Sequence, residues 1–214
     1  MARGSFIVVE GLDGAGTTTQ CAALAERLRA LGREVLVTCE PSTGPIGVQI
    51  RQALSGRLGL ASSRDERPPL TAPTLALMFA ADRMDHLASE IEPALRRGAV
   101  VLCDRYVLSS LAYQGPTVGV EWVQQINAHA LAPDLTLFLK IDVKSASARR
   151  AVRQGAAELY ERDDIQQRTA RWYERAIALR RKCGDRIEII DGRLPVSEVT
   201  ERCLAEIRPK GRRK

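Results

Sequence analysis

A glycine-rich loop is the first segment whose residue types and spacing could do chemistry. Residues 10–20 read EGLDGAGTTTQ and directly follow the apolar run FIVV. Gly11, Gly16 and Thr18 fit the pattern GxxxxGK[ST], in which successive backbone N–H groups and a helix amino terminus cradle a phosphate. The alternative is a tight strand-to-helix turn that holds no ligand. The pattern predicts a phosphate-binding loop made of Gly11, Leu12, Asp13, Gly14, Ala15, Gly16, Thr17, Thr18 and Thr19.

This loop departs from the pattern at Thr17, which stands where a lysine is expected. The lysine of such loops reaches the β- and γ-phosphates as a point charge, and a threonine cannot. Losing one preorganised donor costs on the order of 10² to 10³ in rate, about 3 to 4 kcal/mol, unless another cation replaces it. The loop therefore indicates phosphate binding more directly than it indicates fast phosphoryl transfer.

A second reactive segment, CDRYVLSSLAYQG, covers residues 103–115 at the end of another apolar run. An aspartate that leaves a buried strand beside a phosphate loop is well placed to bind Mg²⁺, which prefers oxygen ligands. Asp104 fits that position, and Thr18 offers a hydroxyl to the same ion. Arg105 can face a phosphate. The alternative is a structural ion pair between Asp104 and Arg105.

A third segment, LMFAADRMDHL, has helical spacing. Phe79 and Arg83 stand four residues apart and therefore share one helix face, where they can stack on a base and clamp a phosphate or a base edge. For Phe79 alone, burial in the core is the competing interpretation.

Five short apolar runs must position these residues. They are rich in Val, Ile, Leu and Phe without polar alternation, which is typical of strands buried on both faces of a parallel sheet. Segments with helical spacing lie between them, among them a long stretch from about Thr74 to Arg97. This alternation predicts an α/β doubly wound domain. The runs are FIVVE (6–10), VLVTCE (35–40), VVLCD (100–104), LTLFLKID (135–142) and IEIID (187–191).

The segment from Arg149 to Arg162 is rich in arginine and has little apolar periodicity. One interpretation is a mobile basic flap. The other is a solvated helix face with ordinary ion pairs.

The charge of +6 lies mostly at one end of the chain. The last seven residues, RPKGRRK, carry five of the 32 basic groups, so residues 1–207 hold 27 basic against 26 acidic residues. A solvated tail is favoured there over an RNA-binding arm. With 214 residues and no apolar stretch of 18 or more, we expect residues 1–207 to form one soluble, cytoplasmic domain that binds neither nucleic acid nor membrane.

The cysteines and histidines do not indicate a metal cage. Five scattered cysteines form no CxxC pair, and we expect reduced thiols in the core. His86 and His129 are distant from them and from each other in the sequence.

Taken together, these segments resemble thymidylate kinase over nearly the whole chain. The matching blocks are FIVVEGLDGAGTTTQ, EPSTGPIGVQIR, FAADR, DRYVLSSLAYQG, APDLTLFLKID and the closing IID, in the order and spacing of that family. The resemblance implies a P-loop fold of the nucleoside monophosphate kinase type, with a five-stranded parallel sheet, helices on both faces and a small lid at about 149–162. It also implies that the protein makes dTDP from dTMP and ATP with Mg²⁺, usually as a homodimer.

The resemblance carries roles over by matching positions. Asp13 would hold the sugar 3′-hydroxyl and help position the acceptor phosphate, Arg105 would grip that phosphate, and Thr18 with Asp104 would organise Mg²⁺. Phe79 would stack on thymine and Tyr113 would disfavour a 2′-hydroxyl. The other substrate-binding residues implied are Glu40, Arg51, Arg83, Ser109, Ser110 and Gln114.

Members of this family carry a catalytic arginine either in the phosphate loop or in the lid. The loop here has none, so the lid type is implied, although Leu159 stands where many relatives have arginine. A guanidinium that bridges β- and γ-oxygens could replace the lysine missing at Thr17. The candidates are Arg149, Arg150 and Arg153.

Three functions stay open on the sequence, and an active dTMP kinase is favoured because the acceptor-side residues are complete. A nucleotide-binding protein with weak or no catalysis would explain Thr17 and Leu159, and a nucleic-acid-binding module would use RPKGRRK. A GTPase is disfavoured, because the only asparagine, Asn127, does not belong to an NKxD element.

Overall fold

The core of the protein is a fully parallel five-stranded sheet with the order β2-β3-β1-β4-β5. The computed structural model describes residues 3–59, 69–152 and 163–207. The predicted strands are confirmed, with small differences at their ends. Their bounds are β1 Phe6–Gly11, β2 Val35–Cys39, β3 Val100–Asp104, β4 Leu135–Lys140 and β5 Ile187–Asp191.

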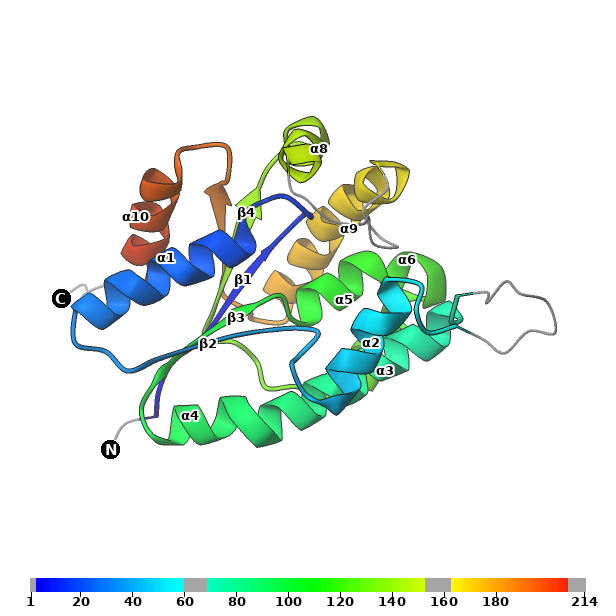
Figure 1. Ribbon diagram of the computed structural model, residues 1–214, viewed down its shortest axis with the longest axis horizontal. Helices are drawn as coiled ribbons and strands as arrows, with labels where there is room; N and C mark the ends of the chain where they lie inside the picture. Colours follow the sequence, from blue (N-terminus) through cyan, green and yellow to red (C-terminus); the bar gives the residue numbers. More distant parts are fainter. Residues whose placement is uncertain (1–2, 60–68, 153–162, 208–214) are drawn as a thin grey trace.

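Helices cover both faces of the sheet (Figure 1). Ile7 and Val9 of β1 point into one hydrophobic cluster, and Phe6 and Val8 point into another on the opposite face. This two-sided burial explains the absence of polar alternation in the strands. The helices are α1 Thr17–Ala30, α2 Pro45–Leu54, α3 Ala72–His86, α4 Glu92–Arg96, α5 Val107–Tyr113, α6 Gly115–Val118, α7 Val120–Ile126, α8 Val143–Val152, α9 Asp163–Lys182 and α10 Val196–Ile207.

The long helix expected from about Thr74 to Arg97 is present but is interrupted by one π-helical turn. This turn, η1 (Leu87–Ile91), joins α3 directly to α4, and the three run in line along one side of the molecule (Figure 1). Pro93 lies just beyond the turn and has no backbone N–H to continue the α-helical ladder. The π-helical turn, in which hydrogen bonds span five residues, accommodates the missing N–H of the proline.

The strand order places the chemistry at the carboxyl ends of β1 and β3. These two strands are neighbours, with Val9 in register with Asp104, and the chain changes sides of the sheet between them. In open α/β sheets ligands bind at such a switch point. The phosphate loop after β1 and Arg105 after β3 therefore face one site.

The cysteine expectation is correct in part. Cys21, Cys103 and Cys203 are buried, and burial raises the pKa of the Cys21 and Cys103 thiols. Cys39 is half-buried. Cys183 is exposed and is not a core thiol, because it follows the end of α9 where the chain turns at Gly184.

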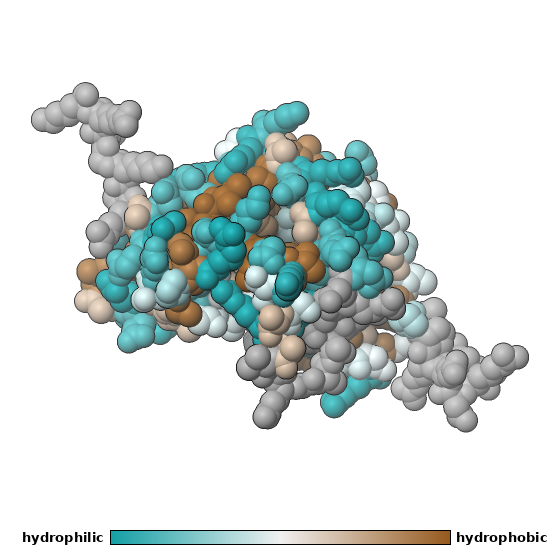
Figure 2. Space-filling view, turned by 90° about the horizontal axis from the view of Figure 1, so that it is seen from above, coloured by the Kyte–Doolittle hydropathy of each residue, from teal (hydrophilic) through white to brown (hydrophobic). Residues whose placement is uncertain are grey.

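The surface seen from the side of α8, α9 and α10 is mostly hydrophilic, with a hydrophobic band across its middle (Figure 2). Within the described ranges, no helix combines the length and the apolar character needed to cross a membrane.

Candidate active site

The glycine-rich loop connects β1 to α1 as predicted. Gly14 and Gly16 have φ of 92° and 91°, a left-handed backbone conformation that favours glycine. Gly16 precedes the first turn of α1, so the unpaired N–H groups of that turn face the loop. Leu12 and Ala15 place their side chains in the core, which leaves only their backbone to face a ligand.

Thr18 and Asp104 meet at the carboxyl ends of β1 and β3. The Thr18 hydroxyl donates a hydrogen bond of 2.5 Å to Oδ2 of Asp104. Oδ1 of Asp104 is buried and has no hydrogen-bond partner in the described part of the chain. A buried carboxylate oxygen without a partner, next to a hydroxyl, fits Mg²⁺, which prefers oxygen ligands.

Arg105 pairs with Asp13 and not with its neighbour Asp104. Its Nη2 donates to Oδ1 of Asp13 at 2.6 Å, so the structural ion pair considered for Asp104 and Arg105 is wrong. Arg105 has φ of 71°, which is uncommon for a residue with a side chain. A hydrogen bond from its backbone N–H to the Val9 carbonyl, 2.9 Å, holds this conformation.

A buried carboxylate that the sequence analysis missed stabilises the turn that contains Arg105. Glu10 is fully buried and accepts hydrogen bonds from the backbone N–H groups of Tyr106 and Ser109, at 2.9 and 3.1 Å. The Ser109 hydroxyl also donates to Glu10 at 2.6 Å, and the Tyr173 hydroxyl donates at 3.1 Å. Burial raises the pKa of Glu10 to about 7, against the opposing effects of the Ser109 hydrogen bonds and the Arg105 charge. The sequence signal that could have identified Glu10 was the presence of an acidic residue inside the apolar run FIVVEG.

The Asp13 carboxylate is held by two further side chains. The Gln166 amide donates to Oδ2 of Asp13 at 2.6 Å and accepts from the Asp13 backbone N–H at 3.3 Å. The Tyr113 hydroxyl donates to the same Oδ2 at 3.0 Å. Gln166 is completely buried on α9 and was not predicted, because no local pattern marks it.

One cavity of about 680 Å³ brings most of the predicted residues together. Its size fits a nucleotide-scale ligand. Gly11, Leu12, Ala15 and Arg150 do not line it. The predicted residues that do are Asp13, Gly14, Gly16, Thr17, Thr18, Thr19, Glu40, Arg51, Phe79, Arg83, Asp104, Arg105, Ser109, Ser110, Tyr113, Gln114 and Arg149.

The end of the cavity away from the loop combines an aromatic ring with polar groups. Phe79 is half-buried in the wall and is not a core residue, and it shares the cavity with Arg83, as their helical spacing predicted. Gln114 is buried and its side-chain oxygen has no partner among the described residues. Arg51 donates hydrogen bonds to the Pro41 carbonyl and, at 3.3 Å, to the Cys39 sulfur.

Two of the three arginines expected in the lid lie beside the phosphate loop. Arg149 donates to the carbonyl oxygens of Gly192, at 3.0 Å, and Ala15, at 3.5 Å. Arg150 donates to the Asp13 carbonyl at 2.7 Å. Both belong to α8 and not to an irregular flap. Arg153 and the rest of the predicted lid, residues 153–162, lie outside the described residues.

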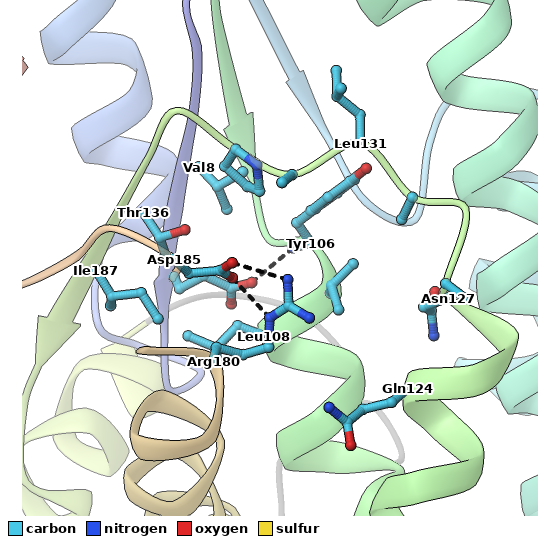
Figure 3. Close-up of a pocket in the computed structure, with 16 residues that line it drawn as sticks. Val8, Tyr106, Leu108, Gln124, Asn127, Leu131, Thr136, Arg180, Asp185 and Ile187 are labelled. Atoms are coloured by element: carbon cyan, nitrogen blue, oxygen red, sulfur yellow. Dashed lines mark hydrogen bonds and ion pairs between the residues drawn. The ribbon is translucent and has the colours of Figure 1, made fainter. Parts of the chain in front are cut away.

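A second cavity, of about 100 Å³, is lined in part by Glu10 and is too small for a nucleotide. Figure 3 shows Tyr106 and Thr136 in its wall, with Arg180 donating two hydrogen bonds to Asp185 at 2.7 and 3.1 Å. Tyr106 lines both cavities. The larger cavity is therefore the candidate active site.

The parallel sheet, the glycine-rich loop at its switch point and the adjoining large cavity define a P-loop protein of the nucleoside monophosphate kinase type. The family model for thymidylate kinase matches residues 9–203. The chain belongs to the thymidylate kinase family and is accordingly a nucleoside monophosphate kinase.

Similar proteins cover nearly the full length of the chain. The thymidylate kinase of Thermomicrobium roseum is 38% identical, over 97% of this chain and 98% of its own. The thymidylate kinase of Ruegeria pomeroyi is 39% identical, over 92% of this chain and 90% of its own. That of Alkalilimnicola ehrlichii is 37% identical, over 93% and 90%. These matches favour the active kinase over the inactive nucleotide-binding alternative.

Proposed function

We propose that the protein transfers the γ-phosphoryl group of ATP to dTMP, giving ADP and dTDP. The observation that carries this proposal is the continuity of the large cavity, which runs from Thr18 at the phosphate loop to Phe79 and Gln114. Phosphoryl transfer requires two polyanions held in line, with cations over the transferred group. One cavity lined by a phosphate loop, an aromatic ring and several arginines meets that requirement.

Asp104 and Thr18 would hold Mg²⁺. When bound, the ion would neutralise charge on the phosphate oxygens of ATP. The unpartnered Oδ1 of Asp104 is free for an additional ligand, whereas Oδ2 is engaged by the Thr18 hydroxyl.

On the acceptor side, Asp13 and Arg105 act as one unit. In this proposal Arg105 grips the dTMP phosphate, and Asp13 holds the 3′-hydroxyl of the sugar. The 2.6 Å bond between them fixes the guanidinium before the substrate arrives. Tyr113, which also bonds Asp13, would exclude a 2′-hydroxyl.

The base would stack on Phe79 and meet Arg83, Ser110 and Gln114. Arg51, in the same wall, would contact the base or its phosphate. The Ser109 hydroxyl already donates to Glu10, so its part in reading the pyrimidine edge is smaller than that of Gln114, whose side-chain oxygen has no partner in the described structure.

On the donor side, Arg149 would supply the charge that Thr17 lacks. Both residues line the same cavity, and the present partners of Arg149 are two backbone carbonyls, which a phosphate would outcompete. Arg150, bonded to the loop carbonyl of Asp13, would hold α8 against the loop.

A coupled assay with ATP and Mg²⁺ tests the reaction against dTMP, dUMP, dGMP and dCMP. We expect dTDP formation on the order of 1 to 100 per second, with dTMP preferred. Absence of dTDP at every enzyme concentration overturns the proposal. Saturable dTMP binding without turnover would instead support the inactive nucleotide-binding alternative.

We also propose a homodimer formed through α2 and α3, which pack together. Leu77 and Met84 are seven residues apart on α3 and are 50% and 43% exposed, and Val48 on α2 is 44% exposed. Light scattering should give twice the chain mass, and Leu77→Glu with Met84→Glu should give a monomer. Leu31→Glu, at a residue 61% exposed beyond α1, is the control. A monomeric wild-type protein at assay concentration contradicts this interface.

A further inference from the structure

A buried ionic chain leads from the wall of the large cavity to the protein surface. It begins at Arg83, whose side chain is 1% exposed. Nη2 of Arg83 donates to Glu40 at 2.6 Å and to the Ser110 hydroxyl at 3.2 Å, and Nη1 donates to the Asn127 side-chain oxygen. Nε of Arg83 has no hydrogen-bond partner within the described ranges. Arg83 thus makes three hydrogen bonds through its two terminal nitrogens, whereas its Nε–H is a free donor as far as the chain is described.

His86 continues the chain behind Glu40. Nδ1 of His86 lies 3.4 Å from Oε1 of Glu40. Nε2 lies 2.7 Å from the Thr38 hydroxyl and 3.0 Å from Oε2 of Glu90. The Glu90 side chain is 38% exposed, whereas His86 and Glu40 are 1% and 3% exposed. The chain Arg83–Glu40–His86–Glu90 therefore connects a buried guanidinium to solvent.

The contacts of His86 favour the doubly protonated ring over either neutral tautomer. Nε2 lies 3.0 Å from Oε2 of Glu90 and 2.7 Å from the Thr38 hydroxyl, which itself donates to Glu90 at 2.9 Å, so a protonated Nε2 has an acceptor in either oxygen. Glu40 accepts from Arg83 at 2.6 Å through Oε2, and its Oε1 faces Nδ1 of His86 as a second acceptor. Nδ1 of His86 can then donate to Glu40. Each ring nitrogen of His86 thus faces a carboxylate oxygen, an arrangement that fits an imidazolium.

We propose that the His86 imidazolium is a positioning residue, which holds Glu40 and through it orients Arg83 for the nucleobase of the acceptor. The inference rests on the proposed function, because it assigns the base to the Arg83 end of the cavity. His86 itself does not line that cavity. Deprotonation of His86 removes the positive charge that holds Glu40, and Glu40 then orients Arg83 less rigidly, so base affinity falls as pH rises.

The charges around His86 support the protonated form. Glu40 faces it from the loop after β2, Glu90 from η1, and Asp82 and Arg83 belong to its own helix, α3. Burial by itself lowers the pKa of His86, but the hydrogen bond to Glu40 and the charges of Glu40, Glu90 and Asp82 outweigh burial and raise it above the ordinary value.

Calorimetric binding of dTMP and of thymidine between pH 6 and 8.5 tests the proposal. Thymidine has no phosphate, so its affinity reports on the base and sugar alone. We expect the wild-type Kd for thymidine to rise about fivefold over this range, a coupling of ordinary size between a proton and a ligand. His86→Gln keeps hydrogen-bonding capacity without a titrating charge, and its Kd should be weak at low pH and independent of pH.

The matched control is His129→Gln, which removes the other histidine, an exposed one outside the cavity. It should keep the wild-type pH profile. Wild-type and His86→Gln profiles that coincide overturn the role of His86. Should His86→Gln fail to fold, Glu90→Gln replaces it: loss of the outer carboxylate should move the midpoint of the thymidine profile to lower pH, and an unmoved midpoint overturns the inference. Failure of the wild-type protein to bind dTMP at any pH would instead refute the proposed function.

Discussion

The Arg105 guanidinium donates to the Asp13 carboxylate at 2.6 Å, across 92 positions of sequence, and so ties the turn after β3 to the phosphate loop after β1. The carboxylate also accepts from Tyr113 and Gln166. All three side chains donate hydrogen bonds, so each depends on a carboxylate oxygen of Asp13 as its acceptor. The Asp13 carboxylate therefore holds Arg105, Tyr113 and Gln166 in place.

Asp13→Asn should lower kcat for dTMP phosphorylation on the order of 10²-fold, because the amide keeps the shape of the side chain but loses the charge that fixes Arg105. ATP affinity should stay within about twofold, since the glycine amides remain. Steady-state kinetics and ATP titration measure both. Glu198→Gln, which removes an exposed carboxylate on α10, is the control. A variant with wild-type kcat would exclude this role for Asp13.

Arg149→Ala should reduce kcat on the order of 10² to 10³-fold if Arg149 replaces the missing loop lysine. Adding Thr17→Lys to that variant should restore part of the rate, because Thr17 is the first residue of α1 and lines the large cavity, where a lysine would return the missing charge. Single-turnover measurements separate this effect from binding.

Arg202→Ala is the matched control for that series, since Arg202 is exposed on α10 and pairs with Glu198. Arg150→Ala tests the neighbouring guanidinium. A large loss in Arg150→Ala together with a normal rate in Arg149→Ala would transfer the compensating charge to Arg150.

Glu10→Gln should change how stability depends on pH. The pKa of Glu10 is about 7 in the folded protein against 4.5 as the ordinary value, so folding favours the protonated form. The stabilising contribution of protonated Glu10 to folding is fully present below about pH 4.5 and is lost as pH rises through 7. The free energy of unfolding changes by about 3 kcal/mol over this range. The difference in unfolding free energy between wild type and Glu10→Gln, measured by urea denaturation at pH 4.5 to 8, should follow that course. A difference constant with pH would show that Glu10 does not titrate in this window.

The sequence was sufficient for the parts of this site that local patterns encode. Buried strands, a glycine-rich turn and the four-residue spacing of Phe79 and Arg83 each follow from a few neighbouring residues. The hydrogen-bond partners of Asp13 and Arg83 do not follow from neighbouring residues. Gln166 meets Asp13 from 153 positions away, and a buried glutamine on a helix has no sequence signature of its own. The pairing of Arg105 with Asp13 in preference to the adjacent Asp104 likewise depends on β1 and β3 being neighbours, which only the folded sheet shows.

Gly14→Ala should be far more damaging than Gly32→Ala, although both glycines have positive φ, 92° and 74°. Each substitution incurs the cost of a left-handed alanine, about 1 to 2 kcal/mol. At Gly32 a Cβ atom would meet no atom within 4 Å, whereas at Gly14 it would lie 2.4 Å from the Ala146 carbonyl oxygen of α8. Because the helix must shift, Arg149 and Arg150 shift with it. Gly14→Ala should therefore lose both stability, seen as a lower Tm, and turnover, whereas Gly32→Ala should lose stability alone. Equal turnover in the two variants would show that the packing of α8 on the phosphate loop does not matter for catalysis.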